Sequence, residues 1–200
     1  MSGPVVIGIG GVASNVGKTT LMCELLRAFR GSEAIKTTRG HYRSCGKDPH
    51  ACCVSHLLGE EALVRSGREE TYELGKDTGR YWDAGAENVH WVIATDAQLG
   101  KGIQQAIERV KAPCVFVEGN SFSEFVQTDC MFMMRSDDHR IKKSAKKVIE
   151  RATAIDVRNI YDELPEVISR VRKFFTAGTT RDAEGHLTSA GLIRPLTHAG

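Results

Sequence analysis

The sequence predicts an α/β fold with a mostly parallel sheet and helices on both of its faces. Three observations carry this prediction. Short apolar runs alternate with segments whose apolar residues recur at helical spacing. A glycine-rich loop joins the first apolar run to the first such helix, and in a later stretch, "VFVEGN", the carboxylate of Glu118 directly follows an apolar run. Because parallel strands need crossover connections, this alternation indicates a sheet that helices cover on both sides.

Each element follows from its own pattern. The run "VVIGIGG" is the first expected strand, and the next segment has apolar residues at helical spacing, namely Leu21, Met22, Leu25, Leu26 and Phe29. Later strands are expected at 33–38, 88–95, 113–120, 129–136 and 152–159. Helices are expected at 100–110, 140–152 and 163–175, with a short one at 57–64.

One domain accounts for most of the chain. Residues 1–175 are expected to form a P-loop nucleotide-binding domain, and 39–72 a cysteine-containing insertion within it. The last segment, 176–200, is rich in glycine, threonine and polar residues, which predicts a peripheral or disordered tail.

Composition excludes several classes of protein. The net charge of +2 is too small to indicate a nucleic-acid partner, and the basic run 140–147 is interpreted as a solvated helix face. No stretch approaches the roughly 20 apolar residues of a membrane span. The first residues lack the basic region of a signal peptide, which predicts a cytoplasmic protein with reduced cysteines.

The loop "GVASNVGKTT" is the strongest functional signal. Glycines let backbone N–H groups curve around an anion, and the following helix adds its positive end. Lys18 is expected to reach the β- and γ-phosphates of a nucleotide, and the Thr19 hydroxyl to bind Mg²⁺. The predicted nucleotide contacts in the loop are Gly11, Ser14, Asn15, Val16, Gly17, Lys18, Thr19 and Thr20.

Glu118 is the predicted acidic partner of this loop. It follows an apolar strand, so it is expected at the carboxyl edge of the sheet, beside Mg²⁺ or its water shell. Lys18 and Glu118 are therefore the candidate catalytic residues of a weak nucleotide hydrolase.

Several short motifs occur in a distinctive order. Five residues separate Gly11 from Gly17, as in dethiobiotin synthetase-like nucleotide enzymes. Residues 4–160 resemble molybdopterin-guanine dinucleotide biosynthesis protein B, on the matching positions Lys36, Gly75–Thr78, Ala84–Ala86 and Val117–Gly119. The resemblance implies a GTP-binding accessory protein of molybdenum-cofactor maturation, a dimer with slow hydrolysis.

A group of cations suggests a further ligand. Lys36, Lys76 and Arg80 follow a strand or precede a helix, where they can converge on phosphate or a second anionic small molecule. Asp77, beside them, is expected to cap the helix and to lie at the nucleotide site.

The segment "CGKDPHACCVSH" offers a candidate zinc or iron site. Cys45, Cys52, Cys53 and His56 are ligand types for zinc or an iron–sulfur cluster, but their spacing matches no standard finger. The alternative is that one or two of these cysteines are buried and the rest incidental.

Two other functions remain open at this point. An ATP-dependent ligase similar to dethiobiotin synthetase would use Lys36 and Lys76 to bind a carboxylated substrate. A nucleotide-gated metal carrier would use the cysteine segment. GTP and ATP are not distinguished, because the chain has no Asn-Lys-x-Asp guanine motif.

Overall fold

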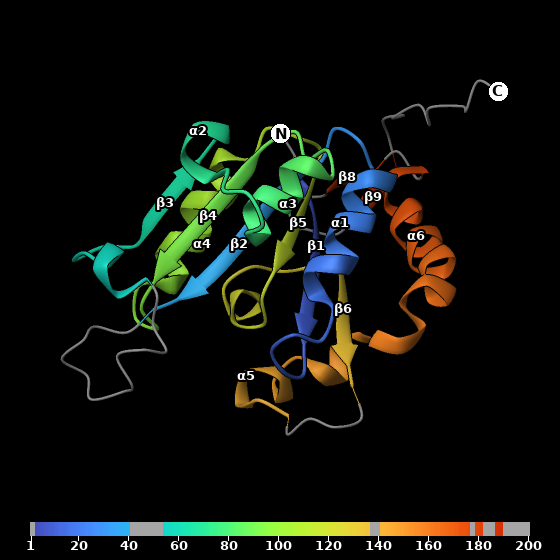
Figure 1. Cartoon of the computed structure of the whole chain (residues 1–200). Coiled ribbons are helices and arrows are strands. Elements are labelled where there is room, and N and C mark those ends of the chain that lie inside the picture. Colours follow the sequence, from blue (N-terminus) through green and yellow to red (C-terminus); the bar gives the residue numbers. More distant parts are fainter. Residues whose placement is uncertain (1–2, 41–53, 137–140, 177–178, 182–186, 190–200) are drawn as a thin grey trace.

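One sheet forms the centre of the computed structural model, which describes residues 3–40, 54–136, 141–176, 179–181 and 187–189 (Figure 1). Its strand order is β3-β4-β2-β5-β1-β6-β7. All neighbouring strands are parallel except β3 and β4, so the predicted mostly parallel sheet is confirmed. The strands are β1 (Val5–Gly11), β2 (Glu33–Arg39), β3 (Leu63–Ser66), β4 (Val89–Ala94), β5 (Cys114–Glu118), β6 (Cys130–Arg135) and β7 (Thr153–Asp156).

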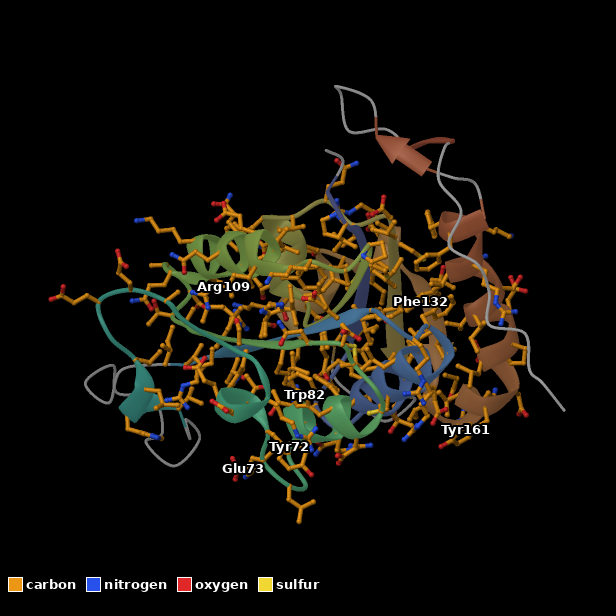
Figure 2. The ribbon with its side chains drawn as sticks, turned by 90° about the horizontal axis from the view of Figure 1, so that it is seen from above. Tyr72, Glu73, Trp82, Arg109, Phe132 and Tyr161 are labelled. Carbon is orange, nitrogen blue, oxygen red and sulfur yellow. The ribbon has the colours of Figure 1, made fainter. Side chains whose placement is uncertain are left out.

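Helices cover both faces of this sheet. Figure 2 shows α4, which ends at Arg109, on one face and α3, which carries Trp82, on the other. On α1, the apolar positions 21, 22, 25 and 26 are all buried, because helical spacing brings them to one side. The helices are α1 (Lys18–Ala28), α2 (Arg68–Thr71), α3 (Asp77–Asp83), α4 (Leu99–Arg109), α5 (Lys143–Lys146) and α6 (Ile160–Thr176).

The predicted helix at 57–64 is wrong. A single 3₁₀ turn, Ser55–Leu57, is followed by β3, which pairs antiparallel with β4 through Val64 and Val92. The unpaired edge of β4 offers backbone hydrogen-bonding groups to a partner strand. That pairing with a distant strand outweighs the local helical pattern.

The predicted helix at 140–152 is also wrong in its extent. Within the described part of this range, 141–152, only Lys143–Lys146 is α-helical, and a 3₁₀ turn follows at Ile149–Arg151. The N–H groups of Val148 and Arg151 bond to carbonyls three residues back, which is the tighter 3₁₀ pattern. The backbone N–H of Lys142 donates to Val12 O, so this region is held against the glycine-rich loop.

The C-terminal region includes a small antiparallel pair, β8 (Thr179–Arg181) with β9 (Leu187–Ser189). It follows α6 directly along the chain. Within the part of the chain that the structure describes, no helix has the length and apolar character that crossing a membrane requires.

A buried polar network joins three strands at the amino end of β2. One Glu33 oxygen accepts the N–H groups of Lys111 and Ala112 at 2.9 Å, and the other lies 2.7 Å from His90 Nε2. His90 Nδ1 lies 2.8 Å from the Ser66 hydroxyl. Although burial opposes ionisation, these bonds hold the pKa of Glu33 below its ordinary value. The network fixes β2, β3 and β4 to one another, far from the carboxyl ends of the parallel strands.

Candidate functional site

The glycine-rich loop connects the carboxyl end of β1 to α1. A Cβ at Gly11 would lie 2.6 Å from Val16 Cγ2 and 3.0 Å from Lys18 Cδ, so Gly11 leaves room for the Lys18 chain to cross it. Gly17, with φ of 83°, is the residue before α1 and occupies the left-handed region that favours glycine. Val16 is buried, whereas Ser14 and Asn15 are exposed. The loop therefore presents Lys18 and Thr19 at the start of α1.

An ion cluster faces this helix start from three other elements. Lys36 Nζ lies 2.6 Å from Asp77 Oδ2 and 2.7 Å from Glu118 Oε1. The Thr19 hydroxyl lies 3.0 Å from Asp77 Oδ1 and 3.2 Å from Glu118 Oε2. The predicted proximity of Thr19 and Glu118 is therefore met, and Asp77 joins them.

Tyr81 is a member of the cluster that the sequence did not reveal. It is completely buried, and its hydroxyl donates to Glu118 Oε2. Burial, followed by the charge of Glu118, raises the pKa of Tyr81 well above its ordinary value. Tyr81 lies four residues after Asp77 on α3, and that spacing, which puts both on one helix face, is the only signal that could have found it.

The charges of the cluster nearly balance. Although burial favours neutral forms, Glu118 and Asp77 raise the pKa of Lys36. Burial likewise opposes ionisation of Asp77, yet Lys36 and the Thr19 hydroxyl lower its pKa. Burial lowers the pKa of Lys18, and the charges of Lys36 and Lys142 lower it further, against the opposing effect of Glu118.

A cavity of about 630 Å³ opens over the loop and the ion cluster. It is large enough for a nucleotide-sized ligand, since such pockets measure roughly 300–1,000 Å³. The predicted site residues that line it are Ser14, Asn15, Gly17, Lys18, Thr19, Thr20, Lys36, Asp77, Arg80 and Glu118.

Lys76 and Asp77, at the start of α3, differ from their predicted positions. The side chain of Lys76 is 66% exposed, lies 3.9 Å from Glu73 and is not among the residues lining the cavity. Asp77 makes no capping bond, because Lys76 occupies the cap position and the Asp77 carboxylate points to Lys36 and Thr19. The prediction that Asp77 caps the helix is therefore wrong.

The cysteine segment falls almost entirely outside the described residues. Cys45, Cys52 and Cys53 lie there, and His56, which is described, is exposed. Among the described residues, no group of three or more His, Cys, Asp or Glu side chains is arranged to hold a metal ion. Cys23 and Cys114 are buried in the core, as their positions within a helix and a strand predict.

A further cavity of about 490 Å³ lies at the carboxyl ends of β6 and β7. Val12, Arg135, Asp156 and Glu163 are among its lining residues. Arg158 donates side-chain and backbone hydrogen bonds to Asp156 and lowers its pKa to about 2. This cavity adjoins the loop at Val12. Its wall carries the positive charge of Arg135 as well as the negative charges of Asp156 and Glu163, and Asp156 is paired with Arg158.

Comparisons of the chain with protein-family models, curated proteins and solved structures gave no significant match.

Proposed function

We propose that this chain is a Mg²⁺-dependent nucleoside triphosphate-binding protein with weak hydrolytic activity, built on a P-loop. One observation carries the proposal. The loop from β1 to α1 brings Lys18 and Thr19 to a large cavity in which Asp77 and Glu118 face them. A cation and backbone amides for phosphate thus lie beside oxygen ligands for a metal.

The residues present fit Mg²⁺, which prefers oxygen ligands in proteins. Thr19, Asp77 and Glu118 would hold the ion, and Tyr81 fixes the orientation of Glu118. When bound, the ion would supply positive charge that offsets the charge developing on the phosphates. Lys18 contributes a second positive charge, and Arg80 contributes a third from α3.

The base is proposed to occupy the cavity at the ends of β6 and β7. Both carboxylate oxygens of Asp156 accept hydrogen bonds from Arg158, two at Oδ1 and one at Oδ2. Oδ2 is the proposed acceptor for an amino hydrogen of guanine or of adenine. Both GTP and ATP therefore remain candidates.

The cellular role is proposed from the sequence resemblance. On that ground, the chain is a dimeric GTP-binding accessory protein in molybdenum-cofactor maturation. The motifs that carry the resemblance lie at 36, 75–78, 84–86 and 117–119. The two elements that differ from the predicted ones, β3 and the short α5, contain none of these positions.

Calorimetric titration with GTP and with ATP, each with and without Mg²⁺, tests the proposal. We expect one nucleotide to bind per chain, more tightly with Mg²⁺, and slow release of phosphate. The nucleotide with the lower dissociation constant identifies the preferred base. Absence of binding by both would refute the proposed function.

Glu118→Gln is expected to impair use of Mg²⁺ more than nucleotide binding. The substitution keeps the shape of the side chain and removes its charge. We expect the Mg²⁺ concentration for half-maximal hydrolysis to rise about 10- to 100-fold, as for the loss of other groups that support a metal site. Phosphate release at varied Mg²⁺ measures this effect.

The matched control is Glu87→Gln, at an exposed position just before β4. It should retain the wild-type Mg²⁺ dependence. An unchanged Mg²⁺ dependence in Glu118→Gln would remove Glu118 from the metal site.

A second candidate, an ATP-dependent ligase, is favoured by one observation. Lys18 and Thr37 also line a small separate cavity beside the nucleotide cavity, where an acceptor molecule could bind. Stoichiometric conversion of a small acid, coupled to ATP cleavage, would support the ligase over the accessory protein.

A further inference from the structure

A small cavity of about 150 Å³ lies beside the proposed nucleotide site. The two cavities share Lys18, Thr37 and Gly119. Lys18, Arg39 and Lys142 contribute cations to the small cavity, and Thr37, Ser121 and Ser144 contribute hydroxyl groups. None of the described residues that line it is an aspartate or glutamate. Its polar groups are therefore cations and hydrogen-bond donors, which suit an anion.

The wall of this cavity is held in place by Asn120. The Asn120 side chain accepts the N–H of Gly11 at 2.9 Å and donates to Gly11 O at 3.0 Å. It also lies 3.3 Å from the Ser144 hydroxyl. One amide thus ties the ends of β1 and β5 to α5, so Ser144 is positioned before any ligand binds.

Two cations reach the cavity from elements outside the glycine-rich loop. Lys142 comes from the residue before α5, and its ammonium lies 2.7 Å from the Ser14 hydroxyl, a neutral partner. Arg39 ends β2 and forms an ion pair with Asp96 at 3.0 Å, with both side chains exposed to water. Such an exposed pair neutralises little of the charge that Arg39 presents to the cavity.

Lys18 and Lys142 carry like charges on the wall of this cavity. The pKa of Lys18 is lowered mainly by burial, and the charges of Lys36 and Lys142 lower it further, against the opposing effect of Glu118. Like charges that face one cavity without a carboxylate repel one another, and an anion between them would reverse this cost.

The cations that the sequence suggested for a second anion are used otherwise. Lys36 is held between Asp77 and Glu118, and Lys76 lies on the surface beside Glu73. Arg80 lines the large cavity proposed for the nucleotide and does not line the small one. A second anionic ligand therefore needs a different set of cations.

We infer that the small cavity binds the anionic end group, phosphate or carboxylate, of a small molecule next to the nucleotide phosphates. A cavity of 150 Å³ is smaller than the roughly 300–1,000 Å³ of drug-sized sites, so it admits one end group of the molecule. The inference rests on the proposed function only for the neighbouring nucleotide, because Arg39 and Lys142 line the small cavity and not the large one.

The test is amide NMR of the full chain saturated with Mg²⁺ and a non-hydrolysable analogue of its nucleotide. Inorganic phosphate and acetate are titrated separately at constant ionic strength. We expect saturable shifts at Ser121 and Ser144. The probe with the lower dissociation constant identifies the end group, and saturation by either one supports the inference.

Substitutions locate the binding. Arg39→Gln and Lys142→Gln should each raise the dissociation constant of the probe about tenfold, as expected for the loss of one charged hydrogen bond. Asp96→Asn removes the ion pair and keeps Arg39, and Lys143→Gln removes a neighbouring exposed lysine. Both controls should bind the probe as the wild type does.

Failure of this inference is distinguishable from failure of the proposed function. Arg39→Gln should leave nucleotide affinity unchanged. If the analogue does not bind, the nucleotide proposal fails, and the phosphate titration of the nucleotide-free chain still depends on Arg39. Absence of saturable shifts, or equal dissociation constants in the wild type and Arg39→Gln, would overturn the inference.

Discussion

Lys18→Ala is expected to weaken nucleotide binding by about 100-fold or more. Its ammonium would contact the β- and γ-phosphates, and the loss of two charged hydrogen bonds corresponds to about 3 kcal/mol. The fold should persist, because the only hydrogen bond that the ammonium makes within the described structure is to Ala13 O, at 3.4 Å. The rise in Tm on addition of nucleotide should therefore be lost, while Tm without nucleotide stays close to the wild-type value.

Lys101→Ala, at an exposed position on α4, serves as the control and should keep the full nucleotide-induced rise. Equal rises in Lys18→Ala and the wild type would show that Lys18 does not contact the phosphates. The P-loop proposal would then lose its main support.

Glu33→Ala is expected to lower the free energy of unfolding by about 3–5 kcal/mol, because it leaves several buried hydrogen-bonding groups unpaired at about 1–3 kcal/mol each. The substitution leaves His90 and the N–H groups of Lys111 and Ala112 without their acceptor. Urea unfolding measures the change. Glu33→Gln, which keeps the size of the side chain, should lose less, about 1–3 kcal/mol.

The contribution of Glu33 should also depend on pH. Its pKa in the folded chain lies below the ordinary value, near 4.3, that it takes when unfolded. The stabilisation is therefore complete above the unfolded pKa and is lost as the pH falls through the folded pKa. The difference in the free energy of unfolding between the wild type and Glu33→Gln should be largest at neutral pH and should become smaller below about pH 4.

Glu108→Gln, on the exposed side of α4, is the control. Its free energy of unfolding should change with pH as that of the wild type does. A difference between the wild type and Glu33→Gln that stays constant from neutral to acid pH would mean that ionised Glu33 does not stabilise the fold.

The strands and the loop were predictable because their signals are local. Apolar runs such as "VVIGIGG" and "VFVEGN" are too short and too continuous for a surface helix. The helix at 57–64 was mispredicted because β3 exists only through its pairing with β4, about 25 residues later. The predicted helix at 140–152 is longer than α5, because the apolar spacing carries no information about the hydrogen bond from Lys142 to Val12.

The ion cluster was only partly predictable for the same reason. Thr19 and Glu118 stand at recognisable ends of a loop and a strand, but Asp77 reaches Thr19 across 58 positions of sequence. An aspartate at the start of a helix is predicted to cap that helix. Only the fold shows that the Asp77 carboxylate faces Lys36 instead. Arg39 and Lys142, likewise, are unremarkable in sequence and meet only at the small cavity.

Lys36 is a counter-ion for Asp77 and Glu118 within the site itself. Its ammonium bonds to both Asp77 and Glu118, the oxygens that a divalent metal would need. Lys36 gains a replacement partner only when a phosphate group lies nearby. Metal and nucleotide are therefore expected to bind with positive thermodynamic coupling, each raising the affinity of the other by the same factor. Free Mg²⁺ alone would compete poorly with the resident lysine, so the chain would respond to the metal–nucleotide complex and not to ambient changes in the metal.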